Sequence, residues 1–301
     1  MRFAYLIMAH DCAAQLDMLI ERLLLQGEDD IAIVHADARS TLFQNLQERE
    51  LRPRTIVVPD PVAVRWGHSS QVSAILKLVE TALEHECDFA HYISGVDWPA
   101  ASRDEVVAEI QSHEALPCCI EAVPGEIEER MQSFRLDTRW LRLDPKTDRV
   151  AYELTWQSRR VSRWIDEARR ALGRERSRPF GPWHKGSSWW SLPREALRCI
   201  AEELPPLIAS GRLAGTLCAD EHVIQSLIAR RFADRIACNR RFVDFERNAS
   251  SPRWLDREDL PAISASGSWF ARKLSLDHDP FFLALPALSQ TANRVADQSR
   301  A

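Results

Sequence analysis

The sequence has no surplus of positive charge. Its 301 residues include 39 Lys and Arg against 44 Asp and Glu, which gives a formal net charge of −5. Proteins that bind nucleic acid through its phosphates carry an excess of basic side chains. We therefore expect no nucleic acid among the partners of this chain. With 45% apolar and 28% charged residues, the composition is otherwise that of an ordinary globular protein.

Long hydrophobic runs are also absent. The first apolar run, Phe3–Ala9, is far shorter than the ~20 residues that a membrane-spanning helix needs. No basic leader with a small-residue cleavage site is visible before it. We expect a soluble, cytoplasmic protein, and peripheral association with the inner face of the membrane stays open as an alternative.

The seven cysteines form no Cys-x-x-Cys pair and have no metal-ligand spacing. An odd number of cysteines scattered through apolar runs indicates reduced, buried thiols. His10, His35 and His68 lack ligand spacing as well, so we expect no zinc. The sequence does contain one Asp-x-Asp, at 277–279, the pattern that binds manganese in many sugar transferases. No strand-like run leads into it, and we therefore expect no metal ion and no cofactor.

The first hundred residues alternate between two patterns. Short apolar runs predict strands, and apolar residues at helical spacing predict helices between them. The expected strands are 3–9, 31–34, 55–58 and 89–93, and the expected helices are 11–25, 41–50 and 72–83. This alternation predicts an α/β fold with parallel strands and crossover helices. Farther along the chain we expect a helix that ends at 203, a helix over 222–230 and a strand over 241–245.

Polar residues follow three of the predicted strands, at the strand ends where an open α/β sheet binds its ligands. They are His10, Asp11, His35, Asp37, Ser94 and Asp97. Asp37 and Arg39 have two interpretations: a carboxylate and a guanidinium that hold a nucleotide, or a helix cap followed by a surface arginine. The turn that contains Ser94 and Asp97 is also explained by turn chemistry alone.

Residues 126–178 differ from the rest of the chain because arginines, Arg130 among them, are interleaved with Trp140, Tyr152, Trp156 and Trp164. Aromatic faces stack on sugar rings, and arginine pairs with carboxylate or phosphate, so this stretch could bind a substrate. It could equally be an amphipathic helix with a solvated basic face, or a surface that docks a partner. The sequence leaves these three alternatives open.

Two further motifs have plain structural explanations when each is taken alone. Asp220 and Glu221 precede a predicted helix, where acidic side chains interact favourably with the helix dipole. Arg272 and Lys273 could be a solvated basic pair. The order of all these motifs along one chain is more specific than any one of them.

Seven blocks spread over nearly the whole chain carry a family resemblance. They are YLIMAHD from Tyr5, HADARS from His35, VRWGHSSQVSAILKLVETAL from Val64, YISGVDWPA from Tyr92, GSSWWSLPREAL from Gly186, ADEHVIQSLI from Ala219 and SGSWFARKL from Ser266. In these blocks the chain resembles the core-2/I-branching β-1,6-N-acetylglucosaminyltransferases and the related peptide O-xylosyltransferases, which form glycosyltransferase family 14. The resemblance runs from Tyr5 to about Asp277 and is weakest in the arginine-rich middle.

The resemblance implies a single GT-A-like α/β domain, Rossmann-like, with a mixed, mainly parallel sheet between helices. On this basis residues 1–125 form the half that binds the nucleotide sugar, and residues 126–285 form the half that binds the acceptor and carries catalysis; residues 286–301 lie beyond the resemblance, and their sequence predicts a loosely structured tail. It further implies an inverting transfer of a sugar, GlcNAc or xylose, from a UDP-sugar to the hydroxyl of a glycan or another acceptor, without a metal ion.

The family motifs assign roles to Glu221, Asp37, Arg39, Arg272 and Lys273, and further polar and aromatic residues are added to the expected site. Glu221 matches the acid that serves as the general base. The residues expected to bind the donor are His10, His35, Asp37, Arg39, Ser94, Asp97, Arg253, Arg272 and Lys273, and those expected to bind the acceptor or its sugar are Asp220, Trp189, Trp190 and Arg130. Ala219 stands where the family commonly has proline, and Ser188 stands where the xylosyltransferases tend to have an acid. The second departure weakens the case for UDP-xylose.

Two other functions remain open at this point. Asp97 and Glu221 could form the acid/base pair of a glycoside hydrolase, which would leave Arg272 and Lys273 without a task. The chain could also be a non-catalytic module that binds a UDP-sugar. For the transferase we expect a role in bacterial surface polysaccharide synthesis, with the acceptor, the linkage and the oligomeric state open.

Overall fold

A computed structural model of the chain describes residues 1–127, 129–134, 149–173, 176, 178–246 and 251–285. The predicted tail at 286–301 lies outside these residues. So do several members of the arginine-rich stretch, namely Arg135, Arg139, Trp140 and Arg142, and the side chains of Tyr152 and Trp156.

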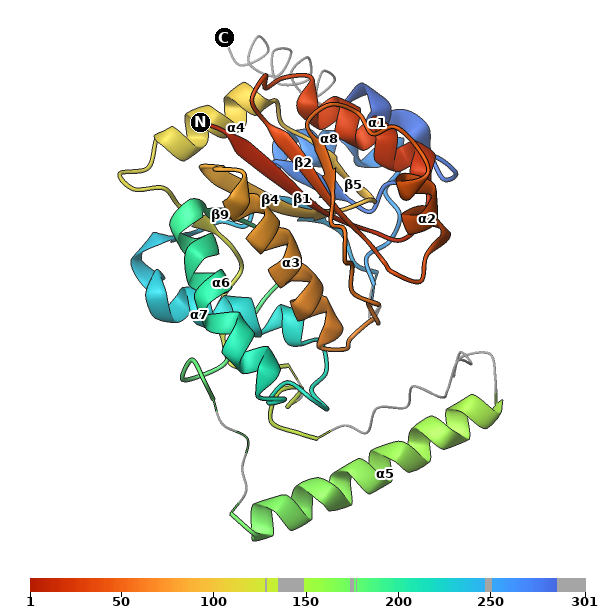
Figure 1. Cartoon of the computed structure of the whole chain (residues 1–301), viewed down its shortest axis with the longest axis vertical. Helices are drawn as coiled ribbons and strands as arrows, with labels where there is room; N and C mark the ends of the chain where they lie inside the picture. Colours follow the sequence, from red (N-terminus) through yellow and green to blue (C-terminus); the bar gives the residue numbers. More distant parts are fainter. Residues whose placement is uncertain (128, 135–148, 174–175, 177, 247–250, 286–301) are drawn as a thin grey trace.

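A seven-stranded sheet forms the centre of the molecule, with the strand order β10-β6-β9-β4-β1-β2-β3 (Figure 1). Its strands are β1 (Phe3–Ala9), β2 (Ile31–Ala36), β3 (Thr55–Val57), β4 (Phe89–Ser94), β6 (Cys118–Cys119), β9 (Trp190–Pro193) and β10 (Ile236–Ala237). β1 pairs in parallel with β2 and β4, whereas β9 runs antiparallel to β4 and β6. The predicted GT-A-like α/β fold, a mixed and mainly parallel sheet in a single domain, is confirmed, and so are the four strands predicted in the first hundred residues.

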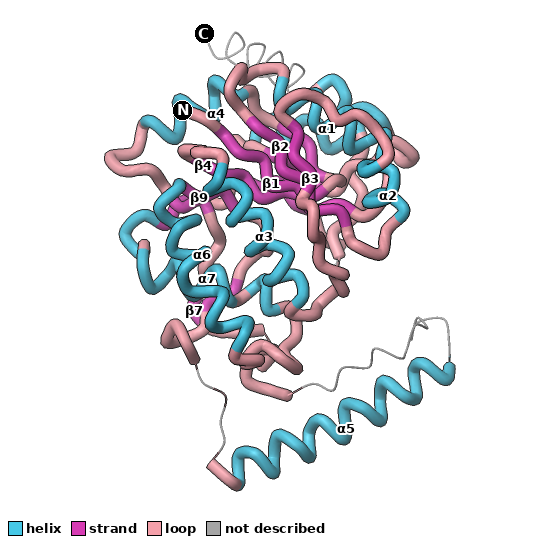
Figure 2. The backbone as a smooth tube through the Cα atoms, viewed as in Figure 1, coloured by secondary structure: helices cyan, strands magenta, loops and turns pink. Residues whose placement is uncertain are grey.

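Helices cover both faces of this sheet, because successive side chains of a strand point to opposite faces (Figure 2). In β1, Tyr5 and Ile7 belong to the core cluster that includes α1, whereas Ala4 and Leu6 belong to the cluster that includes α3. The first face is covered by α1 (Ala13–Leu24), α2 (Thr41–Gln47), α4 (Arg103–Gln111) and α8 (Leu260–Ala265), and the second by α3 (Ser70–Glu84), α6 (Arg194–Ala209) and α7 (Val223–Arg231).

Several helix boundaries differ from the prediction. α1 begins later than expected, at Ala13, because Cys12 adopts a left-handed backbone conformation with a φ of 48°. α6 continues to Ala209, beyond its expected end. α4 is missing from the prediction, although Ser102 and Glu105 form a capping box at its start, a signal that the sequence contains.

A second sheet has three short strands in the order β11-β12-β5. They are β5 (Asp97–Pro99), β11 (Arg241–Val243) and β12 (Phe270–Arg272). β12 runs antiparallel to β5, and this register places Arg272 opposite Asp97. The strand predicted over 241–245 corresponds to the shorter β11, whereas β12 is missing from the prediction, because three residues become a strand only through their distant partners.

The remaining elements lie in the second half of the chain, apart from β7. They are β7 (Val123–Pro124), α5 (Arg149–Ala171), β8 (His184–Lys185) and the 3-10 helices η1 (Ala219–Glu221), η2 (Ala233–Arg235), η3 (Arg257–Asp259) and η4 (Pro280–Ala284). β9 and β10 also come from this half, yet they lie in the same sheet as β1 to β4. The two halves therefore share one sheet, and the division at residue 125 stays a prediction.

The described helices and thiols bear on two further expectations. In the part of the chain that the structure describes, no helix combines the length and the apolar character that crossing a bilayer takes. All seven cysteines are free. The expectation of buried thiols is confirmed for Cys87, Cys118, Cys119 and Cys218 and is wrong for Cys12 and Cys238, which are exposed, while Cys199 is half-buried.

Candidate functional site

The carboxyl ends of β1, β2 and β4 meet at one edge of the large sheet. The Asp37 N–H donates to the Ala9 carbonyl at 3.0 Å, and the Gly95 N–H donates to the Met8 carbonyl at 3.0 Å. His10 follows β1 directly, and its side chain is exposed. The structure therefore brings the polar residues predicted at the strand ends to one edge, as parallel pairing requires.

Asp37 and Arg39 form a local ion pair at this edge. The Asp37 carboxylate accepts hydrogen bonds from the Arg39 backbone N–H at 2.8 Å and from its Nε at 3.2 Å. Partial burial raises the pKa of the Asp37 carboxyl, but the hydrogen bonds from Arg39 outweigh it and hold the pKa below its ordinary value. The Arg39 guanidinium also donates to the Val64 carbonyl, and 56% of its side chain stays exposed. The pair thus fixes the loop after β3 and keeps a cation within reach of a ligand.

His35 is fully buried. Its Nε2 accepts a hydrogen bond from the Val62 N–H at 2.9 Å, and burial lowers the pKa of the ring, which favours the neutral form that this bond needs. The donor contact expected from the sequence does not fit this position. The ring instead holds the segment after β3 against β2.

Asp97 and Arg272 form a buried pair across the second sheet. Asp97 Oδ1 lies 3.5 Å from Arg272 Nε, and Asp97 Oδ2 accepts a hydrogen bond from the Ser94 N–H at 2.7 Å. Asp97 is completely buried, and Arg272 is 7% exposed. Counting the described residues alone, Nε and Nη1 of Arg272 have no hydrogen-bond partner. Nε faces the Asp97 carboxylate, so within the described part of the chain Nη1 is the buried N–H group left without an acceptor, and 9% of the Arg272 side chain stays exposed.

Trp189 supports the guanidinium of Arg272, whose Cζ lies 4.3 Å from the centre of the indole ring. The same indole lies 4.8 Å from the ring of Tyr92. The next residue, Trp190, is completely buried in the core cluster that includes α3 and α6. The expectation that Trp190 contacts the acceptor does not fit this burial, because β9 lies inside the sheet and turns this side chain into the core.

Lys273 follows Arg272 and is less buried. Its Nζ donates to Ser251 Oγ at 2.6 Å and lies 5.1 Å from the ring centre of Trp254. Burial lowers the pKa of the Lys273 ammonium, and the neighbouring charge of Arg272 lowers it further. An anion that binds near both side chains would reduce the electrostatic repulsion between these two positive charges.

Arg253 is engaged within the protein. Its Nε donates to the Asp244 carboxylate at 2.6 Å, and its Nη1 donates to the Asp259 carboxylate at 2.9 Å. These hydrogen bonds raise the pKa of Arg253 and balance its charge. The charge of Arg253 is thus neutralised by two carboxylates, which makes Arg253 a weaker candidate for binding a diphosphate than Arg272 or Lys273.

Glu221 ends η1, and His222 separates it from α7. The turn begins at Cys218, whose φ of 50° is left-handed, and the Gly186 N–H donates to the Glu221 carbonyl at 3.0 Å. Arg130 Nη1 donates to Glu221 Oε2 at 2.7 Å. The Glu221 side chain keeps 30% of its surface exposed. The carboxylate is therefore held by a cation and still open to a substrate.

Asp220 supports this turn from inside. It is 3% exposed, and its carboxylate accepts hydrogen bonds from Ser188 Oγ and from Gln71 Nε2, the latter at 3.3 Å. Its burial assigns Asp220 to the support of the turn and not to the acceptor contact expected from the sequence. Ser188 precedes Trp189, which stacks on Arg272, so one continuous set of contacts joins the turn that carries Glu221 to the buried pair.

The surroundings of Glu221 raise the pKa of its carboxyl to about 7. Burial is the largest cause, and the negative charge of Asp220 adds to it, while Arg130 acts in the opposite direction. A carboxyl group with a pKa near neutrality can take a proton from a substrate and release it again. The site thus combines a proton acceptor with a buried cation in one connected arrangement.

Comparison with known proteins identifies the family. The sequence model of the core-2/I-branching enzyme matches residues 3–263 of the 301. The chain belongs to the core-2/I-branching enzyme family. It is therefore a glycosyltransferase that takes a sugar donor and an acceptor. The match includes Glu221 and ends before Arg272 and Lys273, and no curated protein gives a significant match to the chain.

In this core-2/I-branching enzyme Trp66, which is not among the predicted site residues, is 77% exposed. The Cys218 N–H donates to the carbonyl of Gly67 at 2.7 Å, so the loop that carries Trp66 lies against the turn that carries Glu221. The block VRWGHSS indicated a family motif there without giving the indole a role. An exposed indole on a loop that contacts this turn is suited to stack on a sugar ring.

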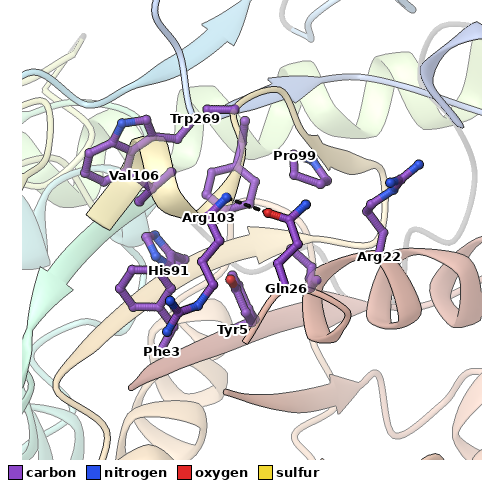
Figure 3. A pocket seen from close by; sticks show the side chains of 12 residues that line it. Phe3, Tyr5, Arg22, Gln26, His91, Pro99, Arg103, Val106 and Trp269 are labelled. Atoms are coloured by element: carbon purple, nitrogen blue, oxygen red, sulfur yellow. Dashed lines mark hydrogen bonds between the residues drawn. The ribbon is translucent and has the colours of Figure 1, made fainter. Parts of the chain in front are cut away.

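A small cavity near the other ends of β1 and β4 is not part of this site (Figure 3). Phe3, Tyr5, Gln26, Arg103 and Trp269 are among its lining residues, and the Arg103 N–H donates to Gln26 Oε1 at 2.6 Å. Its volume of about 20 Å³ leaves room for about one water molecule. It is a packing gap between β1, β4 and α1, too small for a sugar nucleotide.

Proposed function

We propose that this core-2/I-branching enzyme is an inverting, metal-independent transferase that moves GlcNAc or xylose from a UDP-sugar to a hydroxyl of a glycan or similar acceptor. The observation that carries the proposal is the setting of Glu221. Its partly exposed carboxylate has a pKa of about 7, pairs with Arg130 and is connected to the buried guanidinium of Arg272. The reaction requires both a base for the acceptor and a cation for the leaving group.

In the proposed reaction Glu221 takes the proton from the acceptor hydroxyl. The acceptor oxygen forms a bond to the anomeric carbon while the bond from that carbon to the phosphate oxygen breaks. UDP leaves with the electron pair of that bond. Since attack and departure occur on opposite faces, the anomeric configuration inverts. The exposed fraction of the Glu221 side chain, 30%, gives the hydroxyl access to the base.

The nucleotide and its departing charge are assigned to the sheet edge described above. Asp37 and the exposed guanidinium of Arg39 lie at the end of β2, where they hold the nucleoside and a phosphate in this proposal. Arg272 and Lys273 face the diphosphate and stabilise the charge that builds on it. The closeness of the two charges and the exposed part of the Arg272 side chain, 9%, support this assignment.

The Asp-x-Asp at 277–279 has another task in the structure. The Asp279 carboxylate accepts hydrogen bonds from Arg257 Nε at 3.0 Å and from the Phe281 N–H at 3.1 Å, and these bonds hold its pKa far below its ordinary value. This carboxylate caps η4 and balances Arg257. We therefore assign the stabilisation of the negative charge on the leaving group to Arg272 and Lys273.

The two alternatives fit the geometry less well. A glycoside hydrolase that uses Asp97 and Glu221 would need Asp97 to reach a glycosidic oxygen, yet Asp97 is completely buried between Arg272 and the Ser94 N–H. A module that only binds the UDP-sugar gives no reason for a carboxyl group with a pKa of about 7 that remains open to a substrate. We place the transfer in the synthesis of a bacterial surface polysaccharide, at the cytoplasmic face of the membrane.

A panel of UDP-sugars tests this function before any acceptor is known. We expect the purified chain to hydrolyse one of them slowly, with UDP-GlcNAc and UDP-xylose as the first candidates, because water can replace the acceptor. The rate of UDP release should be the same with and without EDTA. Complete loss of UDP release in EDTA, restored by manganese, would contradict the metal-independent mechanism.

The pH dependence of UDP release should follow Glu221. We expect kcat/KM to rise with pH and to level off above about pH 7, because the base works only in its deprotonated form. Arg130→Met removes a cation that lowers the pKa of Glu221, so the rising limb should move to higher pH. The measurement is the pH profile of kcat/KM for the wild type and the variant.

A matched variant should move the rising limb of the pH profile in the opposite direction. Glu121 lies near Glu221 and its charge raises the pKa of the Glu221 carboxyl, so Glu121→Gln should move the same limb to lower pH. Opposite displacements in the two variants are specific for electrostatic control of one titrating group. Identical profiles in both variants and the wild type would show that Glu221 does not titrate in catalysis.

A further inference from the structure

A second cavity lies between the segment that carries Arg130 and the helix α5. It has a volume of about 310 Å³, at the lower end of the ~300–1,000 Å³ that is typical of ligand pockets. Its lining consists of charged and polar residues only: Glu126, Glu129, Gln132, Asp166, Arg169, Arg170, Arg176 and Arg178. It is part of the stretch for which the sequence left open a substrate site, a solvated helix or a docking surface.

The acidic side chains of this arginine cavity are already in use. The Glu126 carboxylate accepts hydrogen bonds from the backbone N–H groups of Met131 at 2.8 Å and Gln132 at 3.2 Å. The Asp166 carboxylate accepts one from the Phe134 N–H at 2.6 Å. These hydrogen bonds fix the local backbone, while the carboxylates keep their negative charge, and the charge of Asp166 still acts on Arg176.

The arginines are less completely balanced. Arg170 pairs with the Glu129 carboxylate at 3.1 Å. Arg169, Arg176 and Arg178 have no carboxylate within 4.0 Å in the portions of the chain for which positions are given. The lining as a whole has four arginines and three carboxylates, so among the residues that line it positive charge is in slight excess.

Two of these cations are crowded around one ring. The guanidinium carbons of Arg169 and Arg176 lie 6.0 Å and 5.6 Å from the ring centre of Phe134. Arg176 is fixed by hydrogen bonds to the carbonyls of Arg212 at 3.1 Å and Ala214 at 2.8 Å. Burial lowers the pKa of Arg176, and the charge of Arg169 lowers it further. An anion in the cavity would relieve this repulsion.

The arginine cavity is close to the reacting groups. Glu126 and Gln132 line it, and Arg130, which binds Glu221, lies between them on the same segment. That segment is tied to the turn of Glu221 by the Ile127 N–H, which donates to His222 Nε2 at 3.2 Å. Two residues of chain span at most about 7 Å, so the backbone at Gln132 lies within about 7 Å of the backbone at Arg130.

We propose that the arginine cavity binds an acidic group, carboxylate or phosphate, on a sugar of the acceptor near the hydroxyl that reacts. The acceptor is then an acidic saccharide. Arginine forks match both groups with paired hydrogen bonds, which accounts for arginine and not lysine at all four basic positions. This assignment deepens the proposed transferase function and rests on it for the direction of the acceptor.

The test compares three saccharides and three proteins. The saccharides are a disaccharide with one uronic acid, a disaccharide phosphate and an uncharged disaccharide, each titrated by calorimetry into the chain saturated with UDP. The proteins are the wild type, Arg169→Gln combined with Arg178→Gln, and Arg163→Gln, which removes an exposed arginine of α5 outside the cavity. The affinity for each probe and its dependence on salt are measured.

We expect the wild type to bind at least one acidic disaccharide tenfold or more tightly than the uncharged one, with an affinity that falls as salt rises. The tighter of the two acidic probes identifies the group. The double variant should lose this preference, and Arg163→Gln should keep it. Equal or no binding of charged and uncharged probes by the wild type, or a full preference in the double variant, would overturn the proposal.

Hydrolysis of the UDP-sugar in water separates this proposal from the proposed function. The double variant should release UDP at a rate within about twofold of the wild type, because the donor site is untouched. A wild type that releases UDP from no sugar nucleotide but still prefers acidic disaccharides would contradict the transferase mechanism and leave the arginine cavity in place. Normal UDP release without a preference for acidic disaccharides would leave the transferase mechanism in place and contradict the assignment of the arginine cavity.

Discussion

Glu221→Gln should lower kcat by about 100- to 10,000-fold, the range that a positioned general base contributes. The amide has the shape of the carboxyl group and can still accept the hydrogen bond from Arg130, so the fold and the loop should be retained. It cannot take a proton from the acceptor. The measurement is the rate of UDP release from the UDP-sugar that the wild type hydrolyses, or the rate of sugar transfer once an acceptor is known.

The affinity for UDP is the internal control for this variant. Glu221 is connected to Arg272 through Ser188 and Trp189 but makes no direct contact with it, so calorimetry should give a UDP dissociation constant close to that of the wild type. Loss of UDP binding together with activity would point to a disturbed fold, which thermal unfolding reveals. Full turnover with glutamine at 221 would remove this residue from the mechanism.

Arg272→Gln should have the second large effect, a fall in kcat of about 100- to 1,000-fold, which is typical when one preorganised donor to a developing negative charge is removed. The variant should also be less stable, since it removes the paired cation of the completely buried Asp97, on which the charge of the buried Arg241 still acts. Breaking a buried pair from one side costs about 3–5 kcal/mol. Urea unfolding measures this loss, and UDP release measures the rate.

A double variant separates the two effects. Asp97→Asn combined with Arg272→Gln removes both charges, and the asparagine oxygen can still accept the hydrogen bond from the Ser94 N–H. We expect most of the stability to return while the rate stays low. A rate that returned together with stability would show that Arg272 only balances Asp97 and has no part in the departure of UDP.

The connected arrangement around Glu221 could be predicted from sequence only in part. The motif ADEHV and the family resemblance single out Glu221, but nothing in the sequence pairs it with Arg130, which is 91 positions away. The same holds for Arg272 and Asp97, which face each other because β12 pairs with β5. Such pairs depend on which segments the fold brings together, and no local periodicity encodes them.

Burial is the other property that the sequence did not provide. His35, Trp190 and Asp220 lie in motifs that resemble ligand-binding blocks, and all three are buried. The identity of a polar or aromatic residue in a family motif does not show whether it contacts the ligand or supports another residue that does. Trp66 shows the opposite case: it lies in the same kind of sequence block as Trp190, yet its side chain is exposed to solvent.

The sequence by itself determined the α/β class, the four parallel strands of the first hundred residues, the polar residues at their ends and the family. These follow from local periodicity, from turn residues and from the order of motifs, all of which can be read along the chain. Only the tertiary structure decided which side chains support the site and which remain open to a substrate. It also decided the pKa of Glu221, because burial and the charges of Asp220 and Arg130 act through space and not along the sequence.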